Sequence, residues 1–183
     1  DSLITVIDIN TAKAIKTIPV GVEPEPITVS PDEKWVASAS EATNMVHWIN
    51  RETLTVEDNT LVDSRPRGLS FSANSQRLWV SSEMGGTITV LDANNHSKIK
   101  TIKFDIPGIK PELIQPVGVI VDKKNQWALV ALGPANRVAL INAQSLEVEK
   151  YFLVGQRVWN LAFSPDQKRV YTTNGVSNDL SVI

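Results

Sequence analysis

The sequence has no cysteine, only two histidines, and no long uninterrupted apolar segment. The absence of cysteine excludes disulfides, thiolate metal sites and a cysteine nucleophile, and it leaves the cellular compartment open. No apolar run approaches the roughly 20 residues that a membrane-spanning helix needs. The formal net charge of −2 gives no general preference for nucleic acid or for an anionic membrane.

The sequence also lacks the short motifs that carry common catalytic chemistry. It has no Gly-x-Ser-x-Gly nucleophile turn, no phosphate-binding loop and no cluster with metal-ligand spacing. Neither His47 nor His96 has a second histidine at ligand spacing, and Met45 near His47 is weak ground for a copper site. The sequence therefore predicts no catalytic residues, no metal and no cofactor.

What the sequence does contain is an internal repeat of about 42 residues. Segments ending in VID, WIN, VLD and LIN place four residues in equivalent positions, at spacings of 42, 42 and 50: Asp8, Asn50, Asp92 and Asn142. The turns in VSPDEK, FSANSQ, VDKKNQ and FSPDQK give a second set, at spacings of 42, 50 and 42: Ser30, Ser72, Asp122 and Ser164. Both sets show the same repeat and the same eight-residue insertion, so chance is a poor explanation.

Each repeat has the pattern of four short strands. The innermost strand is predicted at 27–30, 69–72, 117–121 and 160–164, and a turn with Pro-Asp or a substitute follows it. The second strand is aromatic and β-branched, the third alternates apolar and polar residues, and the fourth leads into the next repeat. The predicted fold is an all-β propeller of four-stranded antiparallel blades, with about four blade equivalents.

The predicted blades span 26–62, 68–104 and 116–154, with partial blades at 1–20 and 159–183. The chain begins within a repeat, so no signal peptide is visible. A blade without its last strand leaves an unpaired edge, which favours a fragment of a larger ring. The alternative is a small ring of about four blades, closed when the N-terminal strands pair with the last blade.

Two segments, KTIPVGVEPEPITVSPDEKWV and RVYTTNGVSNDLSVI, resemble the YVTN-type β-propeller repeat, which is named for its second-strand consensus. At that motif this sequence has Val170, Tyr171, Thr172, Thr173 and Asn174, so either one residue is inserted or the register is loose. The resemblance covers essentially the whole chain. It implies the propeller fold.

A narrower resemblance rests on IQPVGVIV, VALGPANRVALINA and LVGQRVWNLAFSPDQKRVYTTNGVSND. These segments are similar to the propeller proteins associated with pyrroloquinoline-quinone-dependent alcohol catabolism in bacteria. The resemblance implies a periplasmic or secreted location. It also implies a protein partner such as a quinoprotein dehydrogenase, beside which such propellers act without being the catalyst.

In a propeller, the loops that start each blade share one face with the loops between the second and third strands. We call this face the rim, and it is the expected place for function. The repeat places Glu23, Arg65, Gln115 and Arg157 at blade starts, and Glu25, Arg67, Val117 and Trp159 two residues later. It places Glu41, Glu83, Gly133 and Gly175 in the second-to-third-strand loops, with Asn44 and Asn136 nearby.

The rim arginines are the strongest candidates for ligand contact, because a guanidinium offers a forked donor to a carboxylate or another anion. The alternative is that each arginine pairs with a nearby glutamate on a solvated loop. The predicted ligand-binding residues on the rim are Arg65, Arg67, Gln115, Gln156, Arg157, Trp159 and Asn174.

The tryptophans and the insertion carry weaker signals. Trp35 and Trp127 are equivalent in the repeat, and Trp79 and Tyr171 recur two residues later, which predicts packing between blades. Trp159 is the exception, at the mouth of the central channel. The segment FDIPGIKPELIQPVG holds the eight extra residues, either as part of a binding face or as a tolerated loop insertion.

These observations predict a non-catalytic binding or adaptor propeller, with a protein or a small anion as partner. One alternative is a lactonase-like hydrolase using Glu41, Glu83 and Arg157, although the rim lacks a histidine for acid–base work. The other alternative is a structural repeat in a cell-surface array.

Overall fold

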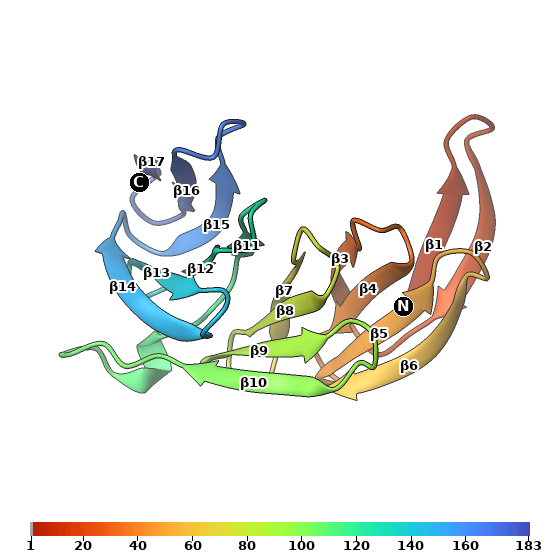
Figure 1. Cartoon of the computed structure of the whole chain (residues 1–183), viewed down its shortest axis with the longest axis horizontal. Helices are drawn as coiled ribbons and strands as arrows, with labels where there is room; N and C mark the ends of the chain where they lie inside the picture. The colour runs from red at the N-terminus through yellow and green to blue at the C-terminus, as the bar shows by residue number, and fades with distance from the viewer. Residues whose placement is uncertain (1) are drawn as a thin grey trace.

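A computed structural model describes residues 2–183 of the chain. It contains 17 strands in five antiparallel sheets, which follow one another along an arc (Figure 1). The strands are β1 (Leu3–Asp8), β2 (Lys13–Pro19), β3 (Pro24–Val29), β4 (Trp35–Ser40), β5 (Met45–Asn50), β6 (Thr55–Leu61), β7 (Pro66–Phe71), β8 (Arg77–Ser82), β9 (Thr87–Asp92), β10 (Lys98–Lys103), β11 (Val119–Val121), β12 (Trp127–Ala131), β13 (Arg137–Asn142), β14 (Glu147–Leu153), β15 (Val158–Phe163), β16 (Val170–Asn174) and β17 (Asp179–Val182).

Three sheets are complete four-stranded blades: β3–β6, β7–β10 and β11–β14. The first strands of successive blades contact one another, β3 with β7, β7 with β11 and β11 with β15, so they line the inner side of the arc. The prediction of an all-β propeller with four-stranded antiparallel blades is confirmed. The strands β3 and β7 begin three residues before the predicted positions, because a bulge near Pro24 and Pro66 extends their pairing.

The residues that define the repeat have a structural reason to recur. In each turn between the third and fourth strands, the side chain of Asp8, Asn50, Asp92 or Asn142 accepts hydrogen bonds from the backbone N–H groups two and three residues later. Such Asx turns replace backbone pairing where the chain reverses. One further residue in each turn has a left-handed backbone, with φ between 54° and 62°: Ala12, Leu54, His96 and Leu146.

The apolar core lies in the seams between neighbouring blades. Trp35 and Trp79 are buried, as predicted, and Trp48 of β5 is buried as well. The expectation fails for Trp127 and Tyr171, each 37% exposed, although Trp127 occupies the same repeat position as Trp35 and Tyr171 the same position as Trp79. The seam beside Trp35 contains the β9–β10 turn, whereas no described residue occupies the corresponding place beside Trp127.

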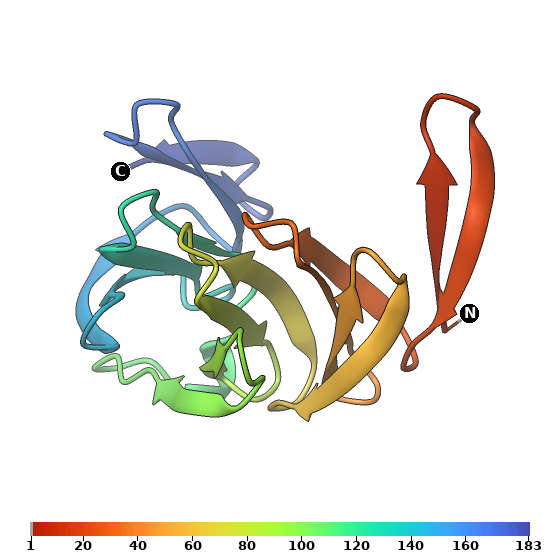
Figure 2. The ribbon, with the colours of Figure 1, turned by 45° about the vertical axis from the view of Figure 1, so that its right-hand side comes forward.

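The two ends of the arc carry incomplete sheets. The strands β1 and β2 form a hairpin at one end, and β15, β16 and β17 form a three-stranded sheet at the other (Figure 2). Within residues 2–183, β1 pairs only with β2 and β17 only with β16. The alternative of a small ring closed by these two ends therefore does not occur in this structure.

The insertion between β10 and β11 packs against the rest of the chain. Ile106 and Ile114 are buried, and a short 3-10 helix, η1 (Pro111–Leu113), lies between them. None of the described helical structure is long and apolar enough to cross a membrane. The insertion thus links the outer strand of the β7–β10 blade to the inner strand of the β11–β14 blade without interrupting the arc.

The two equivalent tryptophans provide a matched test of the seams. We expect Trp35→Ala to lower the free energy of unfolding by about 3–5 kcal/mol, because it removes a buried indole. Trp127→Ala removes a partly solvated indole and should cost less than half as much. Urea unfolding followed by circular dichroism measures both values, and equal losses would contradict the assignment of Trp35 to a packed seam.

Candidate functional site

A backbone hydrogen bond brings the two sets of rim positions together in the β3–β6 blade, in the β7–β10 blade and in the last sheet. The N–H of Glu41 donates to the carbonyl of Glu23 (2.9 Å), and the N–H of Glu83 donates to that of Arg65 (2.8 Å). In the last sheet the N–H of Gly175 donates to the carbonyl of Arg157 (3.0 Å). In these three sheets the residue after the second strand therefore lies beside the residue that starts the same blade, whereas no such bond joins Gly133 to Gln115 among the described residues.

The blade-start residues have an unusual backbone that two asparagines hold in place. Arg65 and Arg157 are in the left-handed region, with φ of 60° and 54°. The N–H of Arg65 donates to Asn44 Oδ1 (2.9 Å), and the N–H of Arg157 donates to Asn136 Oδ1 (2.7 Å). Because each asparagine belongs to the preceding blade, this contact fixes the rim arginine across the seam.

Arg67 is the centre of an ionic cluster that joins the β3–β6 and β7–β10 blades; it comprises Glu25, Glu41, Arg65, Arg67 and Glu83. Arg67 Nη1 lies 2.6 Å from Glu25 Oε2 and 2.8 Å from Glu41 Oε1, and Arg67 Nε lies 2.9 Å from Glu83 Oε2. Because β3 and β7 are adjacent, a guanidinium at the start of β7 reaches carboxylates of both blades.

Arg65 covers the same two buried carboxylates from the solvent side. Its Nε lies 2.9 Å from Glu41 Oε2 and 3.4 Å from Glu83 Oε2. The hydrogen bond from Arg65 to Glu41 and the charge of Glu83 raise the pKa of Arg65, so the side chain remains charged. Within residues 2–183, no hydrogen bond uses its Nη1 or Nη2, and the side chain is 44% exposed.

The cluster is buried on its acidic side. Glu41 and Glu83 are 7% and 5% exposed, so each carboxylate has lost most of its hydration and depends on the arginines for compensation. Glu41 Oε1 has an ion pair but no hydrogen bond aligned with it. Arg65 and Arg67 thus pair with nearby glutamates, which was the alternative to ligand contact. That alternative expected the pairs on a solvated loop, whereas Glu41 and Glu83 are buried.

The same rim positions have different residues in the last two sheets. Where Glu41 and Glu83 stand beside Arg65, the equivalent positions beside Arg157 are Gly133 and Gly175. Arg157 is exposed and makes no ion pair within the described residues. The rim therefore differs between the two parts of the arc. Arg65 belongs to a closed ionic cluster, whereas glycines occupy both positions that would place a carboxylate beside Arg157.

Trp159 replaces the central arginine of the ionic cluster, because its position at the start of β15 corresponds to that of Arg67 at the start of β7. The guanidinium carbons of Arg157 and Arg67 lie 5.6 Å and 5.9 Å from the centre of a Trp159 ring. These distances are within the range of cation–π attraction. We call Gly133, Arg157, Trp159 and Gly175 the open rim segment.

Three other predicted rim residues lie outside these contacts. Gln115 points to the insertion, where its Nε2 donates to the carbonyl of Glu112 (3.1 Å). Gln156 is exposed, and its backbone N–H donates to Ser177 Oγ (2.9 Å). Asn174 is buried within the last sheet, where its Nδ2 donates to Asp179 Oδ1 (2.8 Å) and Ser181 Oγ (2.9 Å).

The pattern that distinguishes the two halves of the rim is not apparent from the repeat alone. The repeat makes Glu41, Glu83, Gly133 and Gly175 equivalent, but it does not connect these positions with the arginines beside them. The available signal was the change from glutamate to glycine at positions paired with Arg65 and Arg157. Only the backbone pairing shows that these positions are neighbours.

A histidine also lies beneath the rim, within the seam between the N-terminal hairpin and the β3–β6 blade. His47 is buried, its Nε2 accepts the Gly21 N–H at 2.9 Å, and the same nitrogen lies 2.9 Å from Ser40 Oγ. Its Nδ1 contacts Asn59 Oδ1. All of these contacts are structural, and among the described residues no group of His, Cys, Asp and Glu is placed to hold a metal ion.

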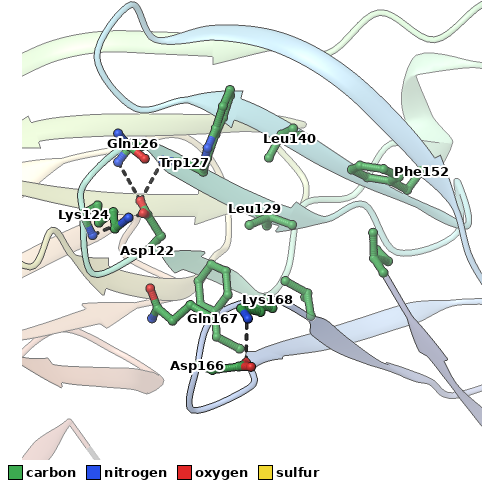
Figure 3. Close-up of a pocket in the computed structure, with 13 residues that line it drawn as sticks. Asp122, Lys124, Gln126, Trp127, Leu129, Leu140, Phe152, Asp166, Gln167 and Lys168 are labelled. Atoms are coloured by element: carbon green, nitrogen blue, oxygen red, sulfur yellow. Dashed lines mark hydrogen bonds between the residues drawn. The ribbon is translucent and has the colours of Figure 1, made fainter.

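An apolar groove lies in the seam between the β11–β14 blade and the last sheet. It has a volume of about 450 Å³, and its lining includes Trp127, Leu140, Phe152 and Phe163 (Figure 3). The equivalents of Trp127 and Leu140 two seams earlier are Trp35 and Trp48, where His96 stacks on Trp48 at 4.2 Å between ring centres. Another turn residue, Leu146, fills the seam beside Trp79.

The groove in Figure 3 therefore lies where a turn residue packs between blades in the two earlier seams. This position argues against a dedicated ligand pocket. Its polar border belongs to turns, where Asp122 Oδ1 accepts the Trp127 N–H (2.7 Å) and Asp166 Oδ1 accepts the Lys168 N–H (3.1 Å). These contacts are already used in shaping the chain. The rim remains the better candidate site.

Comparison with solved structures identifies the same fold. Dihydro-heme d1 dehydrogenase NirN in complex with DHE matches with a TM-score of 0.84 at 20% identity, over 100% of this chain and 39% of that chain. Hydrazine synthase of Kuenenia stuttgartiensis matches with a TM-score of 0.55 at 14% identity, over 100% of this chain and 89% of that chain. No protein-family model and no curated protein matches the sequence. At these identities the likeness shows the fold alone.

The ionic cluster predicts unequal effects of two rim substitutions. Arg67→Ala should lower the free energy of unfolding by about 3 kcal/mol, because it leaves Glu41 and Glu83 buried with less compensation. Arg157→Ala removes an arginine without an ion pair and should cost less than about 1 kcal/mol. Urea unfolding of both variants tests this difference, and losses of equal size would contradict the described cluster.

The buried His47 predicts a dependence of stability on pH. Burial lowers the pKa of His47 below its ordinary value, so the unfolded chain binds a proton first as the pH falls. The contribution of His47 is fully present above about pH 6.5 and is lost as the pH falls towards the lowered folded pKa. His47→Gln, which keeps an acceptor for Gly21, should have a flatter unfolding free energy between pH 7.5 and 5. An unchanged slope would exclude His47 as the cause.

Proposed function

We propose that this chain is a non-catalytic binding module that takes a small carboxylate-bearing anion at the open rim segment. The observation that carries the proposal is the loss of both carboxylate partners of one rim arginine. Arg65 has Glu41 and Glu83 at 2.9 Å and 3.4 Å, whereas the equivalent neighbours of Arg157 are glycines. An anion from solution supplies the charge that the chain does not provide there.

The donors near this segment are suited to an anion. A guanidinium carries five N–H donors and no acceptor. Within residues 2–183, no ion pair and no hydrogen bond engages the Arg157 side chain, and none engages Arg67 Nη2. Glu41 and Glu83 are buried and paired with Arg65 and Arg67, so the exposed side chain of Arg157 is the charged group of the open rim segment without an ion pair among the described residues.

The enzyme alternative has less support. A lactonase-like mechanism needs a group that accepts and returns a proton near its substrate. Glu41 and Glu83 are paired with Arg65 and Arg67, and His47 is buried with its nitrogens engaged. The open rim segment itself contains no carboxylate and no histidine.

The pathway context belongs to the same proposal. The resemblance to propellers of pyrroloquinoline-quinone-dependent alcohol catabolism favours a periplasmic or secreted protein that acts beside a quinoprotein dehydrogenase. The NirN structure is described as a complex with DHE, and a ligand held by a propeller-containing protein is consistent with a binding role. The chain spans 39% of the length of NirN, so we do not transfer that protein's activity.

Calorimetric titration with benzene-1,3-dicarboxylate tests the proposal. Loss of a charge-assisted contact costs about 1.5–3 kcal/mol, so Arg157→Ala should weaken binding roughly tenfold or more. The matched control is Arg169→Ala, because Arg169 is also exposed and lies in the turn at the opposite end of β15 and β16. Its affinity should equal that of the unmodified chain.

Three outcomes would contradict the proposal. The first is no binding at millimolar ligand, and the second is an equal loss in both arginine variants. The third is hydrolysis of a γ-lactone, followed by proton release, that disappears in Glu83→Gln. The third outcome would favour the enzyme alternative directly.

A further inference from the structure

The β7–β10 blade shows how a carboxylate is bound at this rim. Glu83 follows the second strand of its blade, its N–H bonds the carbonyl of Arg65, and its carboxylate meets Arg65 and Arg67. Gly175 makes the same backbone contact with Arg157 but offers no side chain. The backbone therefore defines a position for a carboxylate beside Arg157, but the chain has no side chain at that position.

Space exists at that place. A Cβ added to Gly175 would lie 3.7 Å from Arg157 O, which is an ordinary van der Waals distance. Gly175 is exposed, whereas the equivalent Glu83 is buried under two arginines. A group can therefore approach Arg157 from solvent without displacing a side chain of the last sheet.

The floor beside this place is aromatic. In the ionic cluster the position two residues after the blade start holds Arg67, whereas in the last sheet it holds Trp159, which is half-buried. Glu25 and Val117 are the other residues at this position, so Trp159 is its only aromatic member. An indole offers a flat face for stacking, and the nearby guanidinium planes also stack on aromatic rings.

Resting on the proposed function, we infer that the ligand is an aromatic carboxylate. Its carboxylate takes the place that Glu83 occupies in the earlier blade and pairs with Arg157. Its ring lies against Trp159, where the guanidinium groups of Arg157 and Arg67 are 5.6 Å and 5.9 Å from the indole. An aliphatic acid of the same charge gains only the first of these two contacts.

The chain offers a variant that fills the site. Gly175 does not have a left-handed backbone, so Gly175→Glu introduces no backbone strain and restores the residue of the earlier blades. We expect the new carboxylate to pair with Arg157 and to weaken ligand binding at least about tenfold. Unfolding in urea should remain unchanged or shift to higher urea, which separates occupation of the site from loss of the fold.

The decisive experiment compares benzene-1,3-dicarboxylate with cyclohexane-1,3-dicarboxylate by calorimetric titration. We expect the aromatic acid to bind about five- to tenfold more tightly, which is the range of an aromatic stacking contact. Trp159→Leu should remove this preference and Trp159→Phe should restore most of it. The control is Trp127→Leu, because Trp127 is also partly exposed but lies in the seam groove.

Each outcome has one meaning. Equal affinities of the two acids, both weakened by Arg157→Ala, would overturn the aromatic class and leave the anion site in place. A preference that survives Trp159→Leu would also overturn it. Absence of binding by either acid would overturn the proposed function together with this inference.

Discussion

The backbone hydrogen bond from the residue after the second strand to the carbonyl of the blade-start residue determines the geometry of the rim. It is present between Glu41 and Glu23, between Glu83 and Arg65, and between Gly175 and Arg157. This bond uses only main-chain atoms, so it tolerates any side chain at either position. The same scaffold can therefore hold a salt bridge in one blade and leave an open arginine in another.

The two halves of the rim illustrate this freedom. In the β3–β6 and β7–β10 blades, two arginines compensate carboxylates that have lost most of their hydration. Burying such charges costs free energy of desolvation unless the ion pairs are well formed. Removing one partner destabilises the fold more than replacing the whole cluster with apolar residues, because it leaves a buried charge uncompensated. In the last sheet the carboxylates are absent, so Arg157 carries no such penalty and keeps its donors available to solvent.

Packing between blades depends on a second repeated contact, at the other end of the sheets. A left-handed residue in the turn between the third and fourth strands packs into the seam of the preceding blade, as His96 does on Trp48. His96 also has its Nδ1 2.9 Å from Asp58 Oδ2, so a polar residue is accepted within an aromatic seam. Beside Trp127 none of the described residues makes this contact, and Trp127 and its neighbours line an apolar groove.

The sequence by itself determined the repeat, the blade class and the rim positions, because Asx turns and strand alternation are local features that recur at fixed spacing. It also placed Trp35 and Trp127 as equivalents, but it could not show that their burial differs, since burial depends on the neighbouring blade. Tertiary structure alone decided that Arg67 reaches carboxylates of two blades, that Asn174 is enclosed within its sheet, and that Arg157, beside Gly133 and Gly175, has no carboxylate partner among the described residues. Those outcomes depend on contacts between residues far apart in the chain, and no local pattern encodes which side chain meets which.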